Sequence, residues 1–268
     1  TASAYVINSY DGTYGDLYYS VTDTDEVLRF GEMNRPDIII NCSGMTDISS
    51  CEENPSQAFK VNALGARNLA IVAAKMQAKM VQLSTDDVFD GKSTEPYTEF
   101  DITNPGTVYG KSKLAGENYV KEFTTKHFIV RSTWVYGKGQ NFINGFLKKV
   151  DAGEQLSIAS DQFGSPTSAN ELARFLLHLV HTSEYGTYHA TNKGVCSRYV
   201  FAQEILKMTG KTASMQPVPT VMSDFSKVRP AYAVLDNFIM SMVPIYDFPD
   251  WQDSLREYLE ERGLYHAE

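Results

Sequence analysis

Residues 37–41 read Asp-Ile-Ile-Ile-Asn, and this short apolar run decides the fold class that the chain predicts. A continuous run of β-branched residues is typical of a buried strand in a parallel sheet that is covered on both faces. The preceding residues 23–34 have helical periodicity. Asp23 and Glu26 are spaced as a capping box at the start of this helix, and Pro36 lies just past its end. A helix followed by a buried strand indicates a repeating β/α chain.

The same alternation continues in both directions. Apolar runs predict strands, and amphipathic stretches predict helices. The further strands are expected at Ala4–Tyr10, Met80–Leu83 and Phe128–Arg131, and the further helices at Asn54–Ala78, Thr107–Phe123, Asn141–Ala152 and Ser168–His181. Such alternation predicts an α/β protein with a doubly wound parallel sheet. Beyond about Gly137 the order is less regular, with loops rich in Gly, Pro and Ser, as expected of a smaller lobe that binds a substrate.

The composition limits the classes of function. The 268 residues are 43% hydrophobic and 21% charged, which is typical of a globular protein of one or two domains. The 24 Lys and Arg against 33 Asp and Glu give a net charge of −9, and no basic run is present. This balance argues against a nucleic-acid or anionic-membrane partner. No apolar run approaches the roughly 18 residues of a membrane span, and no signal segment opens the chain.

The cysteines and histidines predict neither disulfides nor a metal site. Cys42, Cys51 and Cys196 are odd in number and lack a C-x-x-C spacing, so they fit reduced thiols in a cytoplasmic protein. His178 and His181 share a helix face at i, i+3, but no further ligand is placed beside them. We therefore expect no metal ion.

The candidate chemistry lies after the predicted strands, because open α/β sheets bind ligands beyond the carboxyl ends of their strands. Thr85 follows the strand that ends at Leu83, and Tyr109 and Lys113 share one face of the next helix. A lysine cation favours the phenolate of a tyrosine, whose free pKa is about 10. Tyr109 can then give a proton to a carbonyl oxygen that Thr85 hydrogen-bonds. The alternative is an ordinary amphipathic helix with a surface lysine, since the Tyr-Lys spacing alone is expected by chance in a chain with 16 tyrosines.

A series of ordered motifs carries a resemblance to a known family. The motifs are Arg35-Pro36-Asp37, Val61-Asn62-Ala63-Leu64-Gly65, Ser84-Thr85-Asp86, Val88-Phe89-Asp90-Gly91, Asn104-Pro105, Tyr109-Gly110, Lys113-Leu114-Ala115-Gly116-Glu117, residues 131–137, residues 161–167 and Arg229-Pro230. With these motifs the chain resembles the extended short-chain dehydrogenase/reductases, and within them the dTDP-4-dehydrorhamnose reductases. The resemblance covers nearly the whole chain.

The resemblance implies an oxidoreductase that uses NADPH or NADH to reduce dTDP-4-dehydro-L-rhamnose to dTDP-L-rhamnose, for nucleotide-sugar and cell-surface polysaccharide synthesis. It implies a Rossmann-like dinucleotide-binding domain at residues 1–137. Residues 138–268 are expected to form mainly a substrate-binding lobe, with some segments returning to the sheet. The expected partner is the dTDP-sugar substrate, the expected location is the cytoplasm, and a homodimer is compatible with the family.

Site residues follow from the same resemblance. Tyr109 is expected to be the proton donor, Lys113 to hold the nicotinamide ribose, and Thr85 to orient the 4-keto oxygen. The other residues on the cofactor side are Asp11, Ser20, Val21, Gly44, Met45 and Thr46. The other residues on the substrate side are Asp86, Asp87 and Trp134. The alternatives are that Trp134 only packs in a cleft wall and that Asp11 is only a turn residue before Gly12.

Three departures from the family pattern limit these expectations. Asp87 stands where the family usually has Tyr, and Ser20 stands where it commonly has Asp. The chain opens at Thr1 directly before the expected second strand. We therefore expect the natural polypeptide to extend about 25 to 30 residues further and to supply the glycine-rich turn. A non-catalytic binding or regulatory relative and a related sugar-nucleotide epimerase remain the alternatives.

Overall fold

The computed structural model describes residues 20–222 and 231–266, which divide into two compact units. Unit 1 comprises the described parts of Thr1–Asp90, Ile102–Arg131 and Leu179–Tyr188. Unit 2 comprises the described parts of Gly91–Asp101, Ser132–His178 and His189–Glu268. The strand predicted at Ala4–Tyr10 lies outside the described residues.

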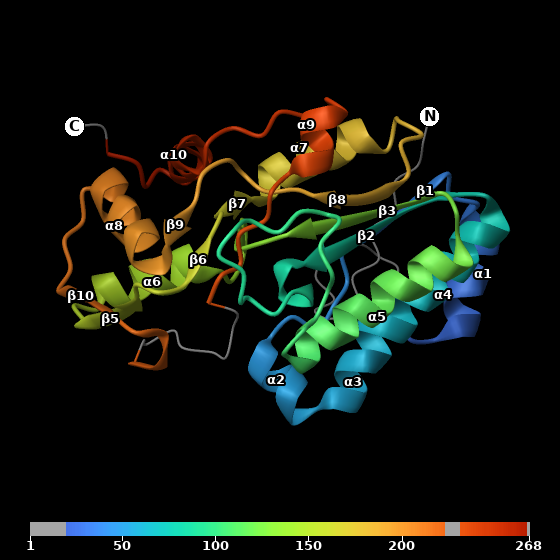
Figure 1. Ribbon diagram of the computed structural model, residues 1–268, viewed down its shortest axis with the longest axis horizontal. Helices are drawn as coiled ribbons and strands as arrows, with labels where there is room; N and C mark the ends of the chain where they lie inside the picture. The colour runs from blue at the N-terminus through green and yellow to red at the C-terminus, as the bar shows by residue number, and fades with distance from the viewer. Residues whose placement is uncertain (1–19, 223–230, 267–268) are drawn as a thin grey trace. The chain divides into compact units, whose positions relative to one another are not determined.

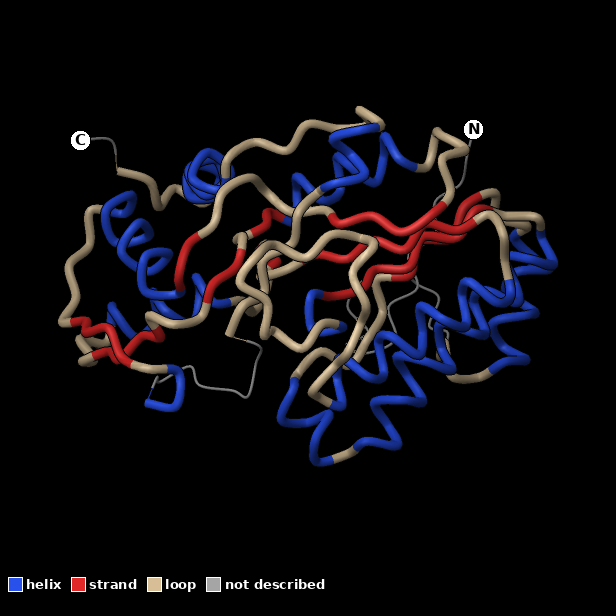
Figure 2. Tube along the Cα trace, viewed as in Figure 1, coloured by secondary structure: helices blue, strands red, loops and turns tan. Residues whose placement is uncertain are grey.

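Unit 1 is built on a sheet with the strand order β1-β2-β3-β8. Its elements are α1 (Thr24–Asn34), β1 (Ile38–Asn41), α2 (Ile48–Glu53), α3 (Pro55–Phe59), the π-helical segment η1 (Lys60–Leu64), α4 (Gly65–Met76), β2 (Lys79–Thr85), the 3-10 helix η2 (Asp86–Val88), α5 (Val108–Phe123), β3 (His127–Ser132) and most of β8 (Gly186–His189). Strands β1 and β2 are parallel, with Ile38 opposite Lys79. Helices α1, α4 and α5 lie together along one face of this sheet (Figures 1 and 2). The predicted α/β class with a parallel central sheet is confirmed.

Helix α1 begins where the capping residues predicted it. The Asp23 carboxylate accepts the backbone N–H groups of Asp25 and Glu26, each at 3.0 Å. These are two of the donors that a helix start leaves without an intrahelical partner. The Glu26 carboxylate reaches back one turn further than in a capping box and accepts the N–H of Ser20 at 3.1 Å. The cap therefore also holds the segment that leads into the helix.

Strand β1 differs from the prediction in its burial. Ile39 packs against the core between α1 and α4, and Asn41 is buried, but Ile40 is 37% exposed. Successive side chains of a strand point to opposite faces, so Ile40 points away from these helices. β1 is also an edge strand among the described strands. The expectation of a strand buried along its whole length is wrong for Ile40.

The long helix predicted at Asn54–Ala78 is present, but it contains a π-helical segment. The chain runs through α3, η1 and α4 without leaving helical backbone, and it ends at Gln77 in the left-handed conformation with φ 58°. A π-helical turn carries an extra residue and is frequent at functional sites. Here the segment contains the buried side chain of Asn62.

Unit 2 contains three two-stranded sheets, in which β4 pairs with β7, β5 with β10 and β6 with β9. Its elements are β4 (Val135–Tyr136), α6 (Phe142–Asp151), β5 (Leu156–Ala159), β6 (Phe163–Gly164), β7 (Thr167–Ser168), α7 (Ala169–Leu179, ending in unit 1), β9 (Cys196–Ser197), α8 (Arg198–Thr209), β10 (Met215–Val218), η3 (Thr220–Met222), α9 (Phe238–Met242) and α10 (Trp251–Glu261). The helices predicted at Asn141–Ala152 and Ser168–His181 are confirmed by α6 and α7.

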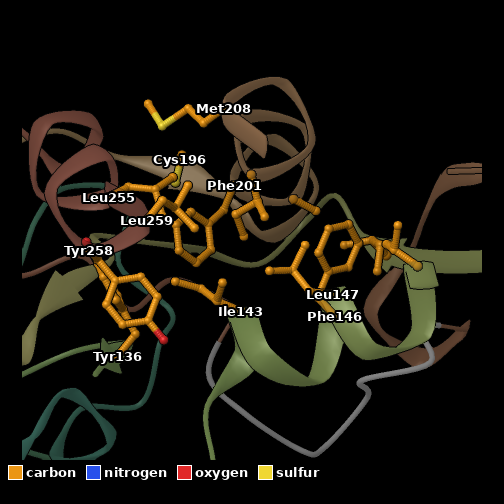
Figure 3. Packing of buried hydrophobic residues seen from close by; sticks show 14 of the residues in the cluster. Tyr136, Ile143, Phe146, Leu147, Cys196, Phe201, Met208, Leu255, Tyr258 and Leu259 are labelled. Carbon is orange, nitrogen blue, oxygen red and sulfur yellow. The ribbon is translucent and has the colours of Figure 1, made fainter. Parts of the chain in front are cut away.

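The core of unit 2 is aromatic. In Figure 3, Ile143, Phe146 and Leu147 of α6 face Phe201 of α8, and the Tyr136 and Tyr258 rings lie side by side. These two tyrosine rings meet edge to face with centroids 5.2 Å apart. No helix was expected after His181, so α8, α9 and α10 were not predicted. In the part of the chain that the structure describes, no helix combines the length and the apolarity that a membrane crossing requires.

Substitution of Gly116 tests how closely α5 packs on η1. A Cβ atom at Gly116 would overlap the backbone carbonyl oxygen of Asn62. We expect Gly116→Ala to lower the free energy of unfolding by about 1 to 3 kcal/mol, because backbone cannot yield as a side chain does. Urea denaturation followed by circular dichroism measures this change.

The matched control is Gly145→Ala in α6, where a Cβ would meet nothing within 4 Å. There we expect a gain of about 0.5 to 1 kcal/mol from helix propensity. Equal effects of the two substitutions would contradict a tight α5–η1 contact.

Candidate active site

The end of β2 brings three of the candidate residues into one tight turn. The Thr85 hydroxyl accepts the N–H of Asp87 at 3.2 Å and donates to the Asp86 carboxylate at 3.0 Å. Thr85, Asp86 and Asp87 are 5%, 4% and 1% exposed. A hydroxyl has one proton to donate, so Thr85 must turn from Asp86 in order to donate to a substrate oxygen.

Helix α5 begins against this turn. The Thr107 hydroxyl caps the helix by accepting the N–H of Gly110 at 2.9 Å. A Cβ atom at Gly110 would overlap the carbonyl oxygen of Asp87, so only glycine permits this approach. The neighbouring Tyr109 is thereby held next to the segment that carries Thr85, and its side chain is 8% exposed.

Lys113 is a buried cation rather than a surface lysine. Its Nζ donates to the carbonyl oxygen of Leu83, near the end of β2, at 2.6 Å, and the residue is only 6% exposed. Burial lowers the pKa of Lys113 to about 8, and the nearby Glu117 and Cys42 act in the opposite direction. The alternative of an ordinary helix with a surface lysine is therefore wrong. A group with this pKa is still largely protonated at neutral pH.

Gly44, Met45 and Thr46 form a turn over the same lysine. A Cβ atom at Gly44 would lie 3.8 Å from Lys113 Nζ and 3.1 Å from Asn62 Oδ1. Thr46 is exposed, and Met45 is buried. The glycine therefore leaves backbone close to the ammonium group, without a side chain between them.

Asn62 connects this turn to the tyrosine helix. Its Oδ1 accepts the N–H of Met45 at 2.8 Å, and its Nδ2 donates to the Met45 carbonyl and to Ser112 Oγ, both at 2.9 Å. Ser112 in turn donates to the carbonyl of Tyr109 at 2.8 Å. Asn62 lies in the Val61–Gly65 motif, but no role was expected for it. Only the fold shows that one amide holds both parts of the site.

Two of the three residues expected to contact the adenosine part of the cofactor, Ser20 and Val21, are among the described residues. Val21 is fully buried, and its carbonyl accepts from Asn68 Nδ2 of α4 at 2.9 Å. Ser20 is exposed, and its hydroxyl is 2.8 Å from that of Thr22. Asp11 lies outside the described residues. The turn that holds Ser20 and Val21 is therefore anchored to α4.

Glu117, one helical turn beyond Lys113, forms a buried ion pair with Arg131 that the sequence did not predict. Arg131 Nε and Nη2 donate to the two carboxylate oxygens of Glu117 at 2.9 and 2.7 Å. Ser84 Oγ donates to the same carboxylate at 2.5 Å, and Glu117 is 0% exposed. Burial alone would raise the pKa of Glu117, yet Arg131 and Ser84 hold it below its usual value. Glu117 is therefore a carboxylate and not a neutral acid.

Trp134 belongs to unit 2, where its indole is tightly packed. Its backbone has φ 46°, which is unusual for a residue other than glycine. A Cβ atom at Gly164 would lie 2.7 Å from Trp134 Cε2, and the Arg198 guanidinium carbon lies 3.6 Å from the ring centroid. A cation at this distance over an indole makes a favourable cation–π contact. The packing expected as the alternative for Trp134 is therefore present, and a ligand contact stays a prediction.

Comparisons with known proteins identify the family of the chain. The profile of the RmlD substrate binding domain matches residues 13–263. The spore coat polysaccharide biosynthesis protein SpsK of Bacillus subtilis (strain 168) is 38% identical over 230 residues, which are 85% of this chain and 81% of that protein.

Two solved structures are similar over most of the chain. A dTDP-4-dehydrorhamnose reductase from Clostridium acetobutylicum superposes with a TM-score of 0.88 at 40% identity, covering 91% of this chain and 87% of that one. The enzyme of the same name from Bacillus anthracis str. Ames, solved in complex with NADP, superposes with a TM-score of 0.86 at 36% identity, covering 91% and 86%. The chain belongs to the RmlD substrate-binding-domain family, within the extended short-chain dehydrogenase/reductases.

Proposed function

We propose that this protein is a reductase of nucleotide-sugar biosynthesis that converts dTDP-4-dehydro-L-rhamnose to dTDP-L-rhamnose with NADPH or NADH. Relatives that carry the name of this activity support the proposal. The observation that carries it is the position of Lys113, which is buried at the end of β2 and lies one helical turn from Tyr109. A cation in that place favours loss of the tyrosine proton, which a carbonyl reductase must deliver.

The residues present fit a nicotinamide dinucleotide. Gly44 leaves room for a ligand to approach the backbone above Lys113, and the ammonium group has three donors, of which one is used by Leu83. Lys113 would hold the nicotinamide ribose, with Gly44, Met45 and Thr46 beside it. Ser20, Val21 and Asp11 are the proposed residues on the adenosine side. When bound, the cofactor supplies the hydride for the reduction.

The side chains of the protein supply the proton for the reduction and stabilise the charges that develop. Tyr109 donates it to the 4-keto oxygen of the sugar, which becomes the new hydroxyl group. Thr85 donates a hydrogen bond to the same oxygen as negative charge develops there, which stabilises the transition state more than the ground state. Lys113 stabilises the tyrosinate left behind by its positive charge. The close approach of Gly110 on α5 to the backbone of Asp87 keeps Tyr109 next to the segment that carries Thr85.

Asp86, Asp87 and Trp134 are proposed contacts of the dTDP-sugar. Asp87 replaces a tyrosine that is usual in the family, so the sugar meets a shorter and acidic side chain at this position. We further propose that residues 1–137 form mainly the dinucleotide-binding domain and residues 138–268 mainly the substrate lobe. The protein would act in the cytoplasm, on a small molecule and not on nucleic acid.

The test is an assay of the full-length protein with dTDP-4-dehydro-L-rhamnose and each reduced cofactor. Loss of the reduced-nicotinamide absorbance together with formation of dTDP-L-rhamnose, identified by NMR, supports the proposal. A sugar that is isomerised without net consumption of cofactor would identify an epimerase instead. Binding of the dTDP-sugar without turnover by either cofactor would identify a non-catalytic relative.

Replacement of Tyr109 by Phe removes the proposed proton donor with little change in volume. We expect kcat to fall by about 10² to 10⁴, the usual contribution of general acid–base catalysis. Steady-state kinetics measures the fall, and circular dichroism with cofactor binding confirms that the site is intact. Retention of more than a tenth of the turnover would show that Tyr109 is not the acid.

Thr85 offers a matched pair of substitutions. Thr85→Val keeps the shape but loses the hydroxyl, and we expect kcat/KM to fall by about 10² to 10³, as for other oxyanion donors. Thr85→Ser keeps the hydroxyl and should stay within about tenfold of the wild type. Equal losses in the two variants would point to the methyl group and against a hydrogen bond to substrate.

A further inference from the structure

The ion pair of Glu117 and Arg131 lies directly behind the proposed active site. Glu117 follows Lys113 by four residues on α5, as Lys113 follows Tyr109, so the three side chains share one helix face. Glu117 has no exposed surface, and Arg131 is 3% exposed. The burial of this ion pair, and the position of Glu117 on the same helix face as Tyr109 and Lys113, suggest that the pair acts on the site.

The carboxylate of Glu117 is held rigidly by three elements. Arg131 of β3 binds both of its oxygens, Ser84 of β2 donates to it, and Lys121 of α5 lies 3.7 Å from it. The guanidinium carbon of Arg131 also lies 5.2 Å from the Phe89 ring centroid. A bidentate carboxylate with a further hydroxyl donor has one orientation, so its charge stays at a defined place near Lys113.

Lys113 requires such a charge because burial opposes its protonated form. Its direct hydrogen bond goes to the carbonyl of Leu83, a neutral acceptor that offsets only part of this penalty. The titratable groups that act on it are Glu117 from its own helix and the Cys42 thiol from the segment after β1, and Tyr109 shares its helix face. Glu117 is the one of these that is fixed as an anion, and its charge favours the cation more than that of Cys42 does.

We propose that Glu117 is a positioning residue that keeps the ammonium group of Lys113 charged and in place beneath the Gly44 turn, with Arg131 and Ser84 holding its carboxylate. This inference rests on the proposed function, because it explains how the lysine of a carbonyl reductase stays cationic although it is buried. It extends the Tyr109–Lys113 pair to a chain of four side chains that ends in β3.

The direct test is a titration of Lys113 in Glu117→Gln. Protein labelled with ¹³C at lysine Cε is titrated by NMR, and the Lys113 resonance is identified by its loss in Lys113→Met. We expect the pKa of Lys113 to fall by about one unit or more, as when an opposite charge is removed nearby. Glu122→Gln, which neutralises an exposed carboxylate on the same helix, should leave it unchanged. An unchanged Lys113 pKa in folded Glu117→Gln would overturn the inference.

A double variant separates electrostatics from folding. Glu117→Gln leaves Arg131 buried without its partner, so this variant is expected to lose stability. Replacing both residues, as Glu117→Met with Arg131→Met, removes the whole pair and should restore much of that stability. Removing Arg131 also removes a cation that disfavours protonated Lys113, so the Lys113 pKa in the double variant should recover only in part. A full return to the wild-type pKa together with the return of stability would show that the pair is only structural.

Enzyme kinetics adds a second readout in the same variants. Protonated Lys113 is lost as pH rises through its pKa, so the rise in KM for the cofactor should grow with pH. The difference from the wild type should close at pH values below the lowered pKa, where both proteins carry the cation. A loss that is the same at every pH would contradict the inference. Because the NMR titration needs no turnover, it stays decisive even if the proposed reaction is not the one the protein catalyses.

Discussion

A lysine that must be both buried and charged is the constraint on which much of unit 1 depends. Lys113 is withdrawn from water beneath the turn at Gly44, where burial pulls its pKa down to about 8. An isolated ammonium in such a place would lose its proton, and with it its effect on a tyrosine. The carbonyl of Leu83 and the carboxylate of Glu117 offset part of this penalty, and Arg131 holds that carboxylate in place. One helix and two strands are thereby tied to one charge.

Close backbone packing makes this arrangement possible. Helix α5 approaches the end of β2 at Gly110 and the π-helical segment at Gly116, in both cases so closely that a methyl group would meet a carbonyl oxygen. Asn62 lies in that same segment, and its amide binds the backbone N–H and carbonyl of Met45 beside Gly44.

In unit 2, the surrounding contacts hold Trp134 in a strained backbone conformation. Trp134 has a positive φ, and its ring is packed against Gly164 and stacked with Arg198. Conformations of this kind cost about 1 to 3 kcal/mol and persist where surrounding contacts determine them. The stacked guanidinium also brings a positive charge beside the residue proposed to meet an anionic dTDP-sugar, which is favourable for such a ligand.

The sequence by itself determined the α/β class, most helices and strands of unit 1, and the candidate residues Thr85, Tyr109 and Lys113, because periodicity and motif order are local properties. It did not predict the exposure of Ile40, because burial of a strand face depends on what covers it. The pairing of Glu117 with Arg131 and the role of Asn62 were decided only by the tertiary structure. These contacts join residues that are not neighbours in the chain. In the sequence, a buried helical carboxylate such as Glu117 cannot be distinguished from one that faces water. Only the tertiary packing excludes water around Glu117, and this exclusion strengthens the interaction of its charge with neighbouring groups.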